Sequence, residues 1–294
     1  MADFRQRPSR PPEGNGDDPG HHPTSMEVFL IILGAMFISQ LLALIVVPIP
    51  GEGEELSSME MKLRMFVLVV TFGLIPLLYL RARRFDMREH LRLTVVPPRS
   101  ILLLSVPLGL ATVLVIDEVD RIMRLIVPFP EEMDTAVREL MAVGGLGEFL
   151  LVMVALVVVD VLAQEGVFRG LLQTTLERQV DVTRAVVYTT VAYTAVHLNL
   201  VAPGTAVPMF LFGFMLAWLS WRTGSILPAA IAHAINNLLA VWDGNGGLSE
   251  TLPIYEWNGH VSPLLLVPAV AILVRGVPYL DAFYRSSAPS SFTD

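Results

Sequence analysis

The sequence predicts an all-α membrane protein with about eight transmembrane helices. Of its 294 residues, 53% are hydrophobic and 16% are charged, and the mean hydropathy is +0.60. The apolar residues fall into runs of about 17 to 22, the length that crosses a hydrocarbon layer at about 1.5 Å per residue. The chain has no cysteine, which excludes disulfides and thiolate chemistry, and its net charge of -8 argues against nucleic-acid binding.

The apolar runs place the predicted spans in chain order. They cover residues 28–47, 65–80, a stretch that starts near 101, 148–173, 182–200, 207–221, 226–242 and 263–274. Residues 1–25 are rich in Pro, Gly, Asp and Arg, so we expect a disordered N-terminal tail without a signal peptide. The membrane domain is predicted to cover 26–280, with its polar core at 148–242 and a C-terminal tail at 281–294.

Charged residues between the spans predict the orientation. The segment 81–99 is the most arginine-rich part of the chain, and such loops stay on the cytoplasmic side. This places both termini in the cytoplasm and is compatible with a bacterial cytoplasmic membrane. The pairs Asp117 with Arg121 and Asp120 with Arg124 are predicted to be interfacial ion pairs at the far end, followed by a short amphipathic helix on the outer surface.

The fourth predicted span is unusual because Asp160, Gln164, Glu165 and Arg169 interrupt it. An ionisable residue within the membrane costs several kcal/mol unless it is paired, so each is a functional-site hypothesis. Glu165 and Arg169 are one helical turn apart, so their charges can cancel. The structural alternative is an ion pair that merely joins two helices.

Two later spans also carry polar side chains. His197 ends the apolar stretch that contains Tyr193, and His233 shares a helix face with Asn237 one turn later. A single such residue more often makes a structural hydrogen bond between helices. At about 1.5 Å per residue, however, these side chains and Glu165 all fall near the middle of the bilayer. We therefore expect neighbouring helices to bring them into one polar pocket.

Three short patterns follow one another along these spans: Glu-x-x-x-Arg, aromatic-x-x-x-His and His-x-x-x-Asn. They are Glu165 with Arg169, Tyr193 with His197, and His233 with Asn237. In this order the patterns resemble the CAAX prenyl endopeptidase and bacteriocin-processing (CPBP) family of intramembrane proteases, also called the abortive-infection family. The resemblance covers about residues 148–242.

The resemblance implies an eight-helix fold that hydrolyses peptide bonds within the membrane. A glutamate acts on water as general base, while histidine and asparagine stabilise the oxyanion, which fits a low-dielectric site. His197, His233 and Glu165 would equally suit a zinc ion with an open coordination position. The implied partners are the lipid bilayer and a membrane-associated peptide or protein substrate, which in this family can be lipidated.

The sequence departs from the family pattern at one position. The motif usually begins with two adjacent glutamates, of which the first activates water, but Gln164 stands there and glutamine cannot act as a base. Three explanations are open: an engineered change that silences the enzyme, a natural pseudoprotease, or transfer of the role to Glu165 or to Asp160, one turn earlier on the same face.

Two other classes of function remain open. A catalytically inert membrane scaffold or immunity-type protein would use the same pocket to bind a partner, and Gln164 favours that alternative. A transporter or proton conductor would use the buried charges as a relay, but the sequence has no inverted repeats or paired broken helices.

Overall fold

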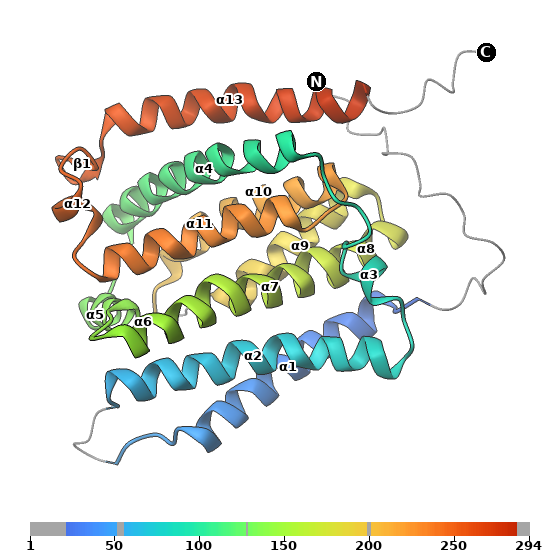
Figure 1. Cartoon of the computed structure of the whole chain (residues 1–294), viewed down its shortest axis with the longest axis horizontal. Coiled ribbons are helices and arrows are strands. Elements are labelled where there is room, and N and C mark those ends of the chain that lie inside the picture. Colours follow the sequence, from blue (N-terminus) through green and yellow to red (C-terminus); the bar gives the residue numbers. More distant parts are fainter. Residues whose placement is uncertain (1–21, 52–55, 128, 199–200, 287–294) are drawn as a thin grey trace.

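The computed structural model describes residues 22–51, 56–127, 129–198 and 201–286. The predicted N-terminal tail therefore lies mostly outside the described residues, as do residues 287–294 of the predicted C-terminal tail. The described chain is almost entirely helical, and its long helices run roughly parallel to one another (Figure 1). The all-α fold class is confirmed.

The helices and strands follow the chain from α1 to α13. The segments α6, η1, α7, η2 and α8 form one continuous helix from Leu146 to Gln179, which we call the central helix. The full set is α1 (Ser25–Val46), α2 (Ser58–Ala82), α3 (Met87–His90), α4 (Arg99–Ile126), α5 (Glu131–Met141), α6 (Leu146–Val152), η1 (Met153–Asp160), α7 (Val161–Gln164), η2 (Glu165–Leu172), α8 (Gln173–Gln179), α9 (Val182–His197), η3 (Pro203–Thr205), α10 (Ala206–Thr223), α11 (Leu227–Gly244), α12 (Leu248–Thr251), β1 (Glu256–Trp257), β2 (His260–Val261) and α13 (Pro263–Ser286).

Six helices of the described chain are long and apolar enough to cross a membrane: α1, α2, α4, the central helix, η3 with α10, and α13. The expected count of about eight is not confirmed. α9 has only 16 residues, and α11 carries His233, Asn236 and Asn237 among its apolar residues. Both nevertheless lie alongside the other helices of the bundle (Figure 1). Two of the polar side chains that lower the hydropathy of α11, His233 and Asn237, are ones expected to form the site.

Helix boundaries extend beyond the predicted apolar runs. α1 and α2 each begin with a capping box, in which Thr24 pairs with Glu27 and Ser57 with Glu60. Such caps satisfy backbone N–H groups that the first turn leaves unpaired, so the helices begin in polar sequence before the apolar run. The last predicted span ended at residue 274, which is too short, because α13 continues to Ser286.

Small residues allow the helices around the central helix to pack closely. A Cβ atom added at Gly73 of α2 would lie 2.7 Å from the Cβ of Ala163, and one added at Gly109 of α4 would lie 2.7 Å from the Cα of Ala232. Only glycine permits these approaches, a common feature of membrane helix packing. Gly109 therefore fixes where α11, with His233, sits against α4.

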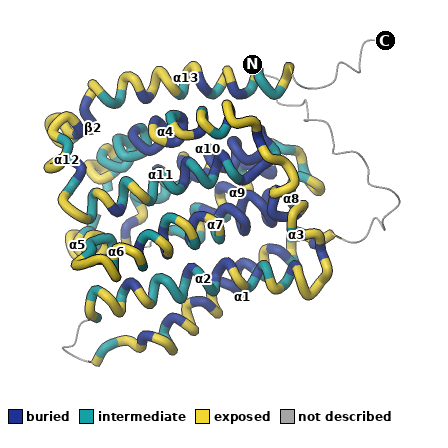
Figure 2. The backbone as a smooth tube through the Cα atoms, viewed as in Figure 1, coloured by how far each residue is buried: buried dark blue, intermediate teal, exposed yellow. Residues whose placement is uncertain are grey.

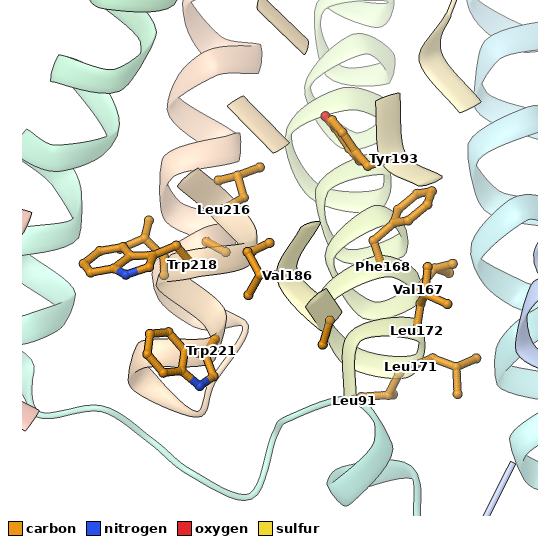
Figure 3. Packing of buried hydrophobic residues seen from close by; sticks show 14 of the residues in the cluster. Leu91, Val167, Phe168, Leu171, Leu172, Val186, Tyr193, Leu216, Trp218 and Trp221 are labelled. Carbon is orange, nitrogen blue, oxygen red and sulfur yellow. The ribbon is translucent and has the colours of Figure 1, made fainter. Parts of the chain in front are cut away.

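The core lies between the central helix, α9 and α10, and the bundle exposes apolar side chains on its outer helices. Figure 2 shows buried residues concentrated in these inner elements and exposed residues on α1 and α13. Phe168 and Tyr193 are fully buried and meet edge to face, with ring centroids 5.4 Å apart (Figure 3). Exposed apolar side chains such as Phe37 and Leu264 are appropriate to a lipid environment.

Polar contacts at the two ends of the bundle join the connecting segments. At one end, where α3 and α8 lie, Ser25 donates a hydrogen bond to Gln179 over 2.6 Å and Arg178 forms an ion pair with Glu89 (Figure 1). At the opposite end, Tyr255 beside the β1–β2 hairpin donates to Asp117 over 2.7 Å. The short amphipathic helix expected after the ion pairs of Arg121 and Arg124 is present as α5, and none of its residues is buried.

Candidate functional site

The centre of the site is a fully buried ion pair on the central helix. Arg169 Nη1 lies 3.0 Å from Glu165 Oε1, and both side chains have no exposed surface. Arg169 Nη2 also donates to the backbone carbonyl of Gly213 on α10 over 3.1 Å, and the guanidinium lies 4.3 Å from the centre of the Tyr193 ring. The predicted pairing of Glu165 with Arg169 is thus present, and the arginine additionally joins α9 and α10 to the central helix.

His233 connects α11 to this ion pair. Its Nδ1 lies 2.8 Å from Glu165 Oε1, although the two residues are 68 positions apart. Because the carboxylate accepts, the imidazole donates its Nδ1 proton, and a neutral ring then leaves Nε2 with a lone pair. Phe212 contacts the ring edge to face, with centroids 5.6 Å apart, which fixes the orientation of the imidazole.

A second group of hydrogen bonds surrounds Asp160, one turn before Gln164. Gln164 Nε2 donates to Asp160 Oδ1 over 2.7 Å, and Asn237 Nδ2 lies 3.3 Å from Asp160 Oδ2. Asn237 Nδ2 also donates to the backbone carbonyl of Leu156 over 2.8 Å. Asp160 therefore lies between two amide side chains from different helices, and the amide oxygen of Gln164 is buried without a hydrogen-bond partner in the described structure.

His197 lies at the end of α9, beside Tyr193. Its Nδ1 is 2.7 Å from the Tyr193 carbonyl oxygen, which accepts the proton, and the two rings are 4.3 Å apart. His197 is only partly buried. Through Tyr193 it is joined to Arg169, and so to Glu165 and His233, whereas Gln164 and Asn237 make their contacts with Asp160.

The described side chains do not make a metal centre. No three His, Cys, Asp or Glu residues of the described chain group closely enough to hold a metal ion. Glu165 Oε1 is already shared by Arg169 and His233, so this carboxylate oxygen is engaged by two donors. A guanidinium beside the carboxylate also opposes a second positive charge there. This arrangement does not fit zinc held by His197, His233 and Glu165, and we derive no chemical step through a metal.

Several participants could not be found from the sequence. The backbone carbonyls of Gly213 and Leu156 accept hydrogen bonds from Arg169 and Asn237, but a backbone acceptor has no signature in side-chain patterns. Gly213 does have a signal, since it is a glycine inside an apolar helix. A Cβ atom at Gly213 would lie 2.8 Å from Tyr193 Cδ1, so this position requires a residue without a side chain.

The central helix also differs from an ordinary α-helix. It is π-helical in η1 and η2, and the four residues of α7 between them end at Gln164. π-helical turns are rare and occur often at functional sites, because the wider turn rotates the following side chains relative to an α-helix. Asp160 ends the first π-helical segment and Glu165 begins the second.

Comparison with known proteins agrees with the motifs. Residues 146–239 match the family model described as Type II CAAX prenyl endopeptidase Rce1-like. No curated protein and no solved structure matches the chain. The long apolar helices indicate a multi-pass membrane protein, and residues 146–239 are similar to a CAAX-type protease domain. The resemblance to the CPBP family is confirmed for this segment, which contains all of the site residues named above.

Proposed function

We propose that this protein is an intramembrane endopeptidase that hydrolyses peptide bonds of membrane-associated proteins or peptides by attack of water. The observation that carries the proposal is the bond between Glu165 and His233, which joins the central helix to α11 at 2.8 Å. Together with the ion pair to Arg169, this bond places a carboxylate, an imidazole and a guanidinium side by side within the bundle. Burying any one of these groups there without a partner would cost free energy.

Each polar group has a role in such a reaction. Arg169 neutralises Glu165, and Glu165 in turn orients the His233 ring. An imidazole held at Nδ1 presents its Nε2 to a substrate or to water, as in other hydrolases that pair a carboxylate with histidine. Asn237 is proposed to donate to the oxyanion by turning the N–H that makes the longer, 3.3 Å contact with Asp160, while its other N–H stays on the Leu156 carbonyl.

The substrate is proposed to be a protein or peptide that reaches the site from the lipid. The support is the CAAX-type domain, whose family acts on lipidated proteins or small peptides, together with the apolar outer surface of the bundle. The arginine-rich end, with Arg83, Arg88 and Arg178, is proposed to face the cytoplasm of a bacterial cell. The first turn of α1 and the last turn of α13 lie toward that end, which supports cytoplasmic termini (Figure 1).

An inert scaffold of the same fold is the second candidate, and Gln164 is the observation that favours it. A glutamine at the expected base leaves the usual water-activating carboxylate absent. A scaffold would keep the hydrogen bonds of the site intact and bind a partner without cleaving it.

Peptide hydrolysis by the purified protein in lipid tests the proposal. A library of membrane peptides, lipidated and unmodified, would be incubated with and without a chelator and read by mass spectrometry. We expect cleavage that His233→Ala abolishes and that a chelator leaves unchanged, because the described donor set does not fit a metal. Capture of intact peptides without cleavage would favour the scaffold. Loss of cleavage with chelator would support a zinc-dependent reaction.

A further inference from the structure

We propose that Asp160 is the carboxylate that activates water, in place of the glutamate expected at position 164. The inference rests on the proposed endopeptidase function and deepens it. The hydrogen bond between Gln164 and Asp160, the burial of Asp160 and the engagement of Glu165 by two other residues carry the argument.

Glu165 is poorly suited to the role of base. Its side chain has no exposed surface. Oε1 accepts from Arg169 and from His233, and Oε2 is buried without a hydrogen-bond partner in the described structure. A base must be reached by water, but the Glu165 side chain is enclosed on all sides and is held by a guanidinium and an imidazole. Glu165 therefore acts as a positioning residue that holds His233.

Asp160 has the opposite environment. It is buried, with 8% of its surface exposed, yet no cation of the described chain lies within ion-pair distance of it. Its oxygens accept from neutral amides, those of Gln164 and Asn237, and both of these side chains are only partly buried. Asp160 is thus a carboxylate that keeps some exposed surface and is held in place by neutral amides, so a water molecule can reach it.

The residue at position 164 matches this arrangement. The amide nitrogen of Gln164 donates to Asp160 over 2.7 Å. A glutamate in the same rotamer would place a second carboxylate at that distance, and two carboxylates so close cannot both ionise. Gln164 thus fits a site whose water-activating carboxylate lies one turn closer to the N-terminus, at Asp160. In such a site glutamine at position 164 does not silence the enzyme.

The proposed step conserves atoms and charge. Asp160 accepts a proton from water while the water oxygen bonds to the peptide carbon, and the carbonyl electron pair moves onto its oxygen. The protonated Asp160 then donates the proton to the peptide nitrogen. The electron pair on the oxyanion re-forms the carbonyl bond as the carbon–nitrogen bond breaks, and a carboxylic acid and an amine are released. General acid–base catalysis of this kind contributes roughly 10²–10⁴-fold to the rate.

Three variants test the assignment in the same lipid assay: Asp160→Asn, Gln164→Glu, and the two combined. We expect Asp160→Asn to lose at least about 100-fold in hydrolysis rate. The combined variant, which returns a carboxylate to position 164, should regain a measurable part of it. Gln164→Glu alone should be no faster than the unchanged protein. Recovery in the combined variant would show that the carboxylate, and not the shape of residue 160, was lost.

Asp181→Asn serves as the matched control, because Asp181 is exposed and asparagine also caps a helix well. Thermal unfolding in detergent must show that Asp160→Asn remains folded. Unchanged hydrolysis by folded Asp160→Asn would overturn the inference and leave the protease intact. A gain of tenfold or more by Gln164→Glu would also overturn it and identify a silenced enzyme. Absence of cleavage in every variant would instead contradict both the inference and the proposed function.

Discussion

Two polar regions of this protein use the same pairs of residues in different surroundings. The central cluster is formed by Asp160, Gln164, Glu165, Arg169, His233 and Asn237. The hairpin cluster lies at the end of α4 beside β1 and β2 and is formed by Asp117, Glu118, Arg121, Tyr255, Glu256 and His260.

Both clusters contain a carboxylate–arginine pair one turn apart and a histidine that donates Nδ1 to a carboxylate over 2.8 Å. In the hairpin cluster the side chain of Arg121 is 21% exposed and that of His260 is 43% exposed, whereas Arg169 has no exposed surface and His233 has 3%. Pair geometry alone therefore does not mark a functional site. Position within the bundle distinguishes the two clusters, because only the buried charges lose their hydration, and this desolvation opposes folding.

Removal of an arginine should separate the two regions most strongly. Arg169→Ala leaves Glu165 buried without its cation, and we expect a loss of about 3–5 kcal/mol in the free energy of unfolding. Arg121→Ala, which removes the partly exposed pairs with Asp117 and Glu256 in the hairpin cluster, should cost about 1 kcal/mol or less for each pair. Thermal unfolding in detergent measures both. Equal losses would mean that burial does not set the strength of these pairs.

Removal of a histidine should lower the rate of hydrolysis in the central cluster but not in the hairpin cluster. His233→Ala is expected to lower hydrolysis at least about 100-fold while the helices remain folded, and His197→Ala should do the same. His260→Ala, which breaks the equivalent bond to Glu118, should leave the rate within about threefold, because it only loosens the hairpin. Peptide cleavage in liposomes compares the three. A fall in activity with His260→Ala as large as with His233→Ala would contradict a special role for the central cluster.

Close helix packing offers a smaller perturbation of the central cluster. Gly109→Ala would place its Cβ 2.7 Å from the Cα of Ala232, beside His233, so α11 must shift. We expect a destabilisation of about 1–3 kcal/mol and a lower rate of hydrolysis. Gly34→Ala on α1 is the control, because nothing lies within 4 Å of its added Cβ, and it should be neutral or slightly stabilising. Unfolding and cleavage assays on both variants would show whether the α4–α11 contact positions the site.

The smallest expected effect is a pH dependence outside the spans, at His90 on α3. Burial lowers the pKa of His90 below its usual value, although the hydrogen bond to the Asp86 carbonyl partly opposes this. The unfolded chain therefore binds the proton first as the pH falls. Stability is full above about pH 6.5 and declines as the pH falls toward the folded pKa. Unfolding measured from pH 8 to pH 5 should show this slope, and His90→Asn should reduce it; an equal slope in that variant would reject the assignment.

The sequence predicted which residues meet at the centre better than it predicted the extent of the helices. Charged residues in an apolar run are rare, so Glu165, Arg169, His233 and Asn237 were identifiable without a structure. Helix ends were less well predicted, because capping by Thr24 or Ser57 and continuation of α13 to Ser286 occur where hydropathy has no signal. The partners of Asp160 could not be predicted from the sequence either, since the contact with Asn237 depends on how α11 packs against the central helix.

Incorporation of heavy oxygen tests the central claim most directly. Hydrolysis in water labelled with oxygen-18 places the label in the new carboxyl terminus of each fragment. The account predicts labelled fragments from the unchanged protein in lipid and none from His233→Ala at equal folded amounts. Fragments of equal yield and labelling from both proteins, or the absence of labelled fragments from the unchanged protein across the peptide library, would contradict a hydrolytic site at the central cluster.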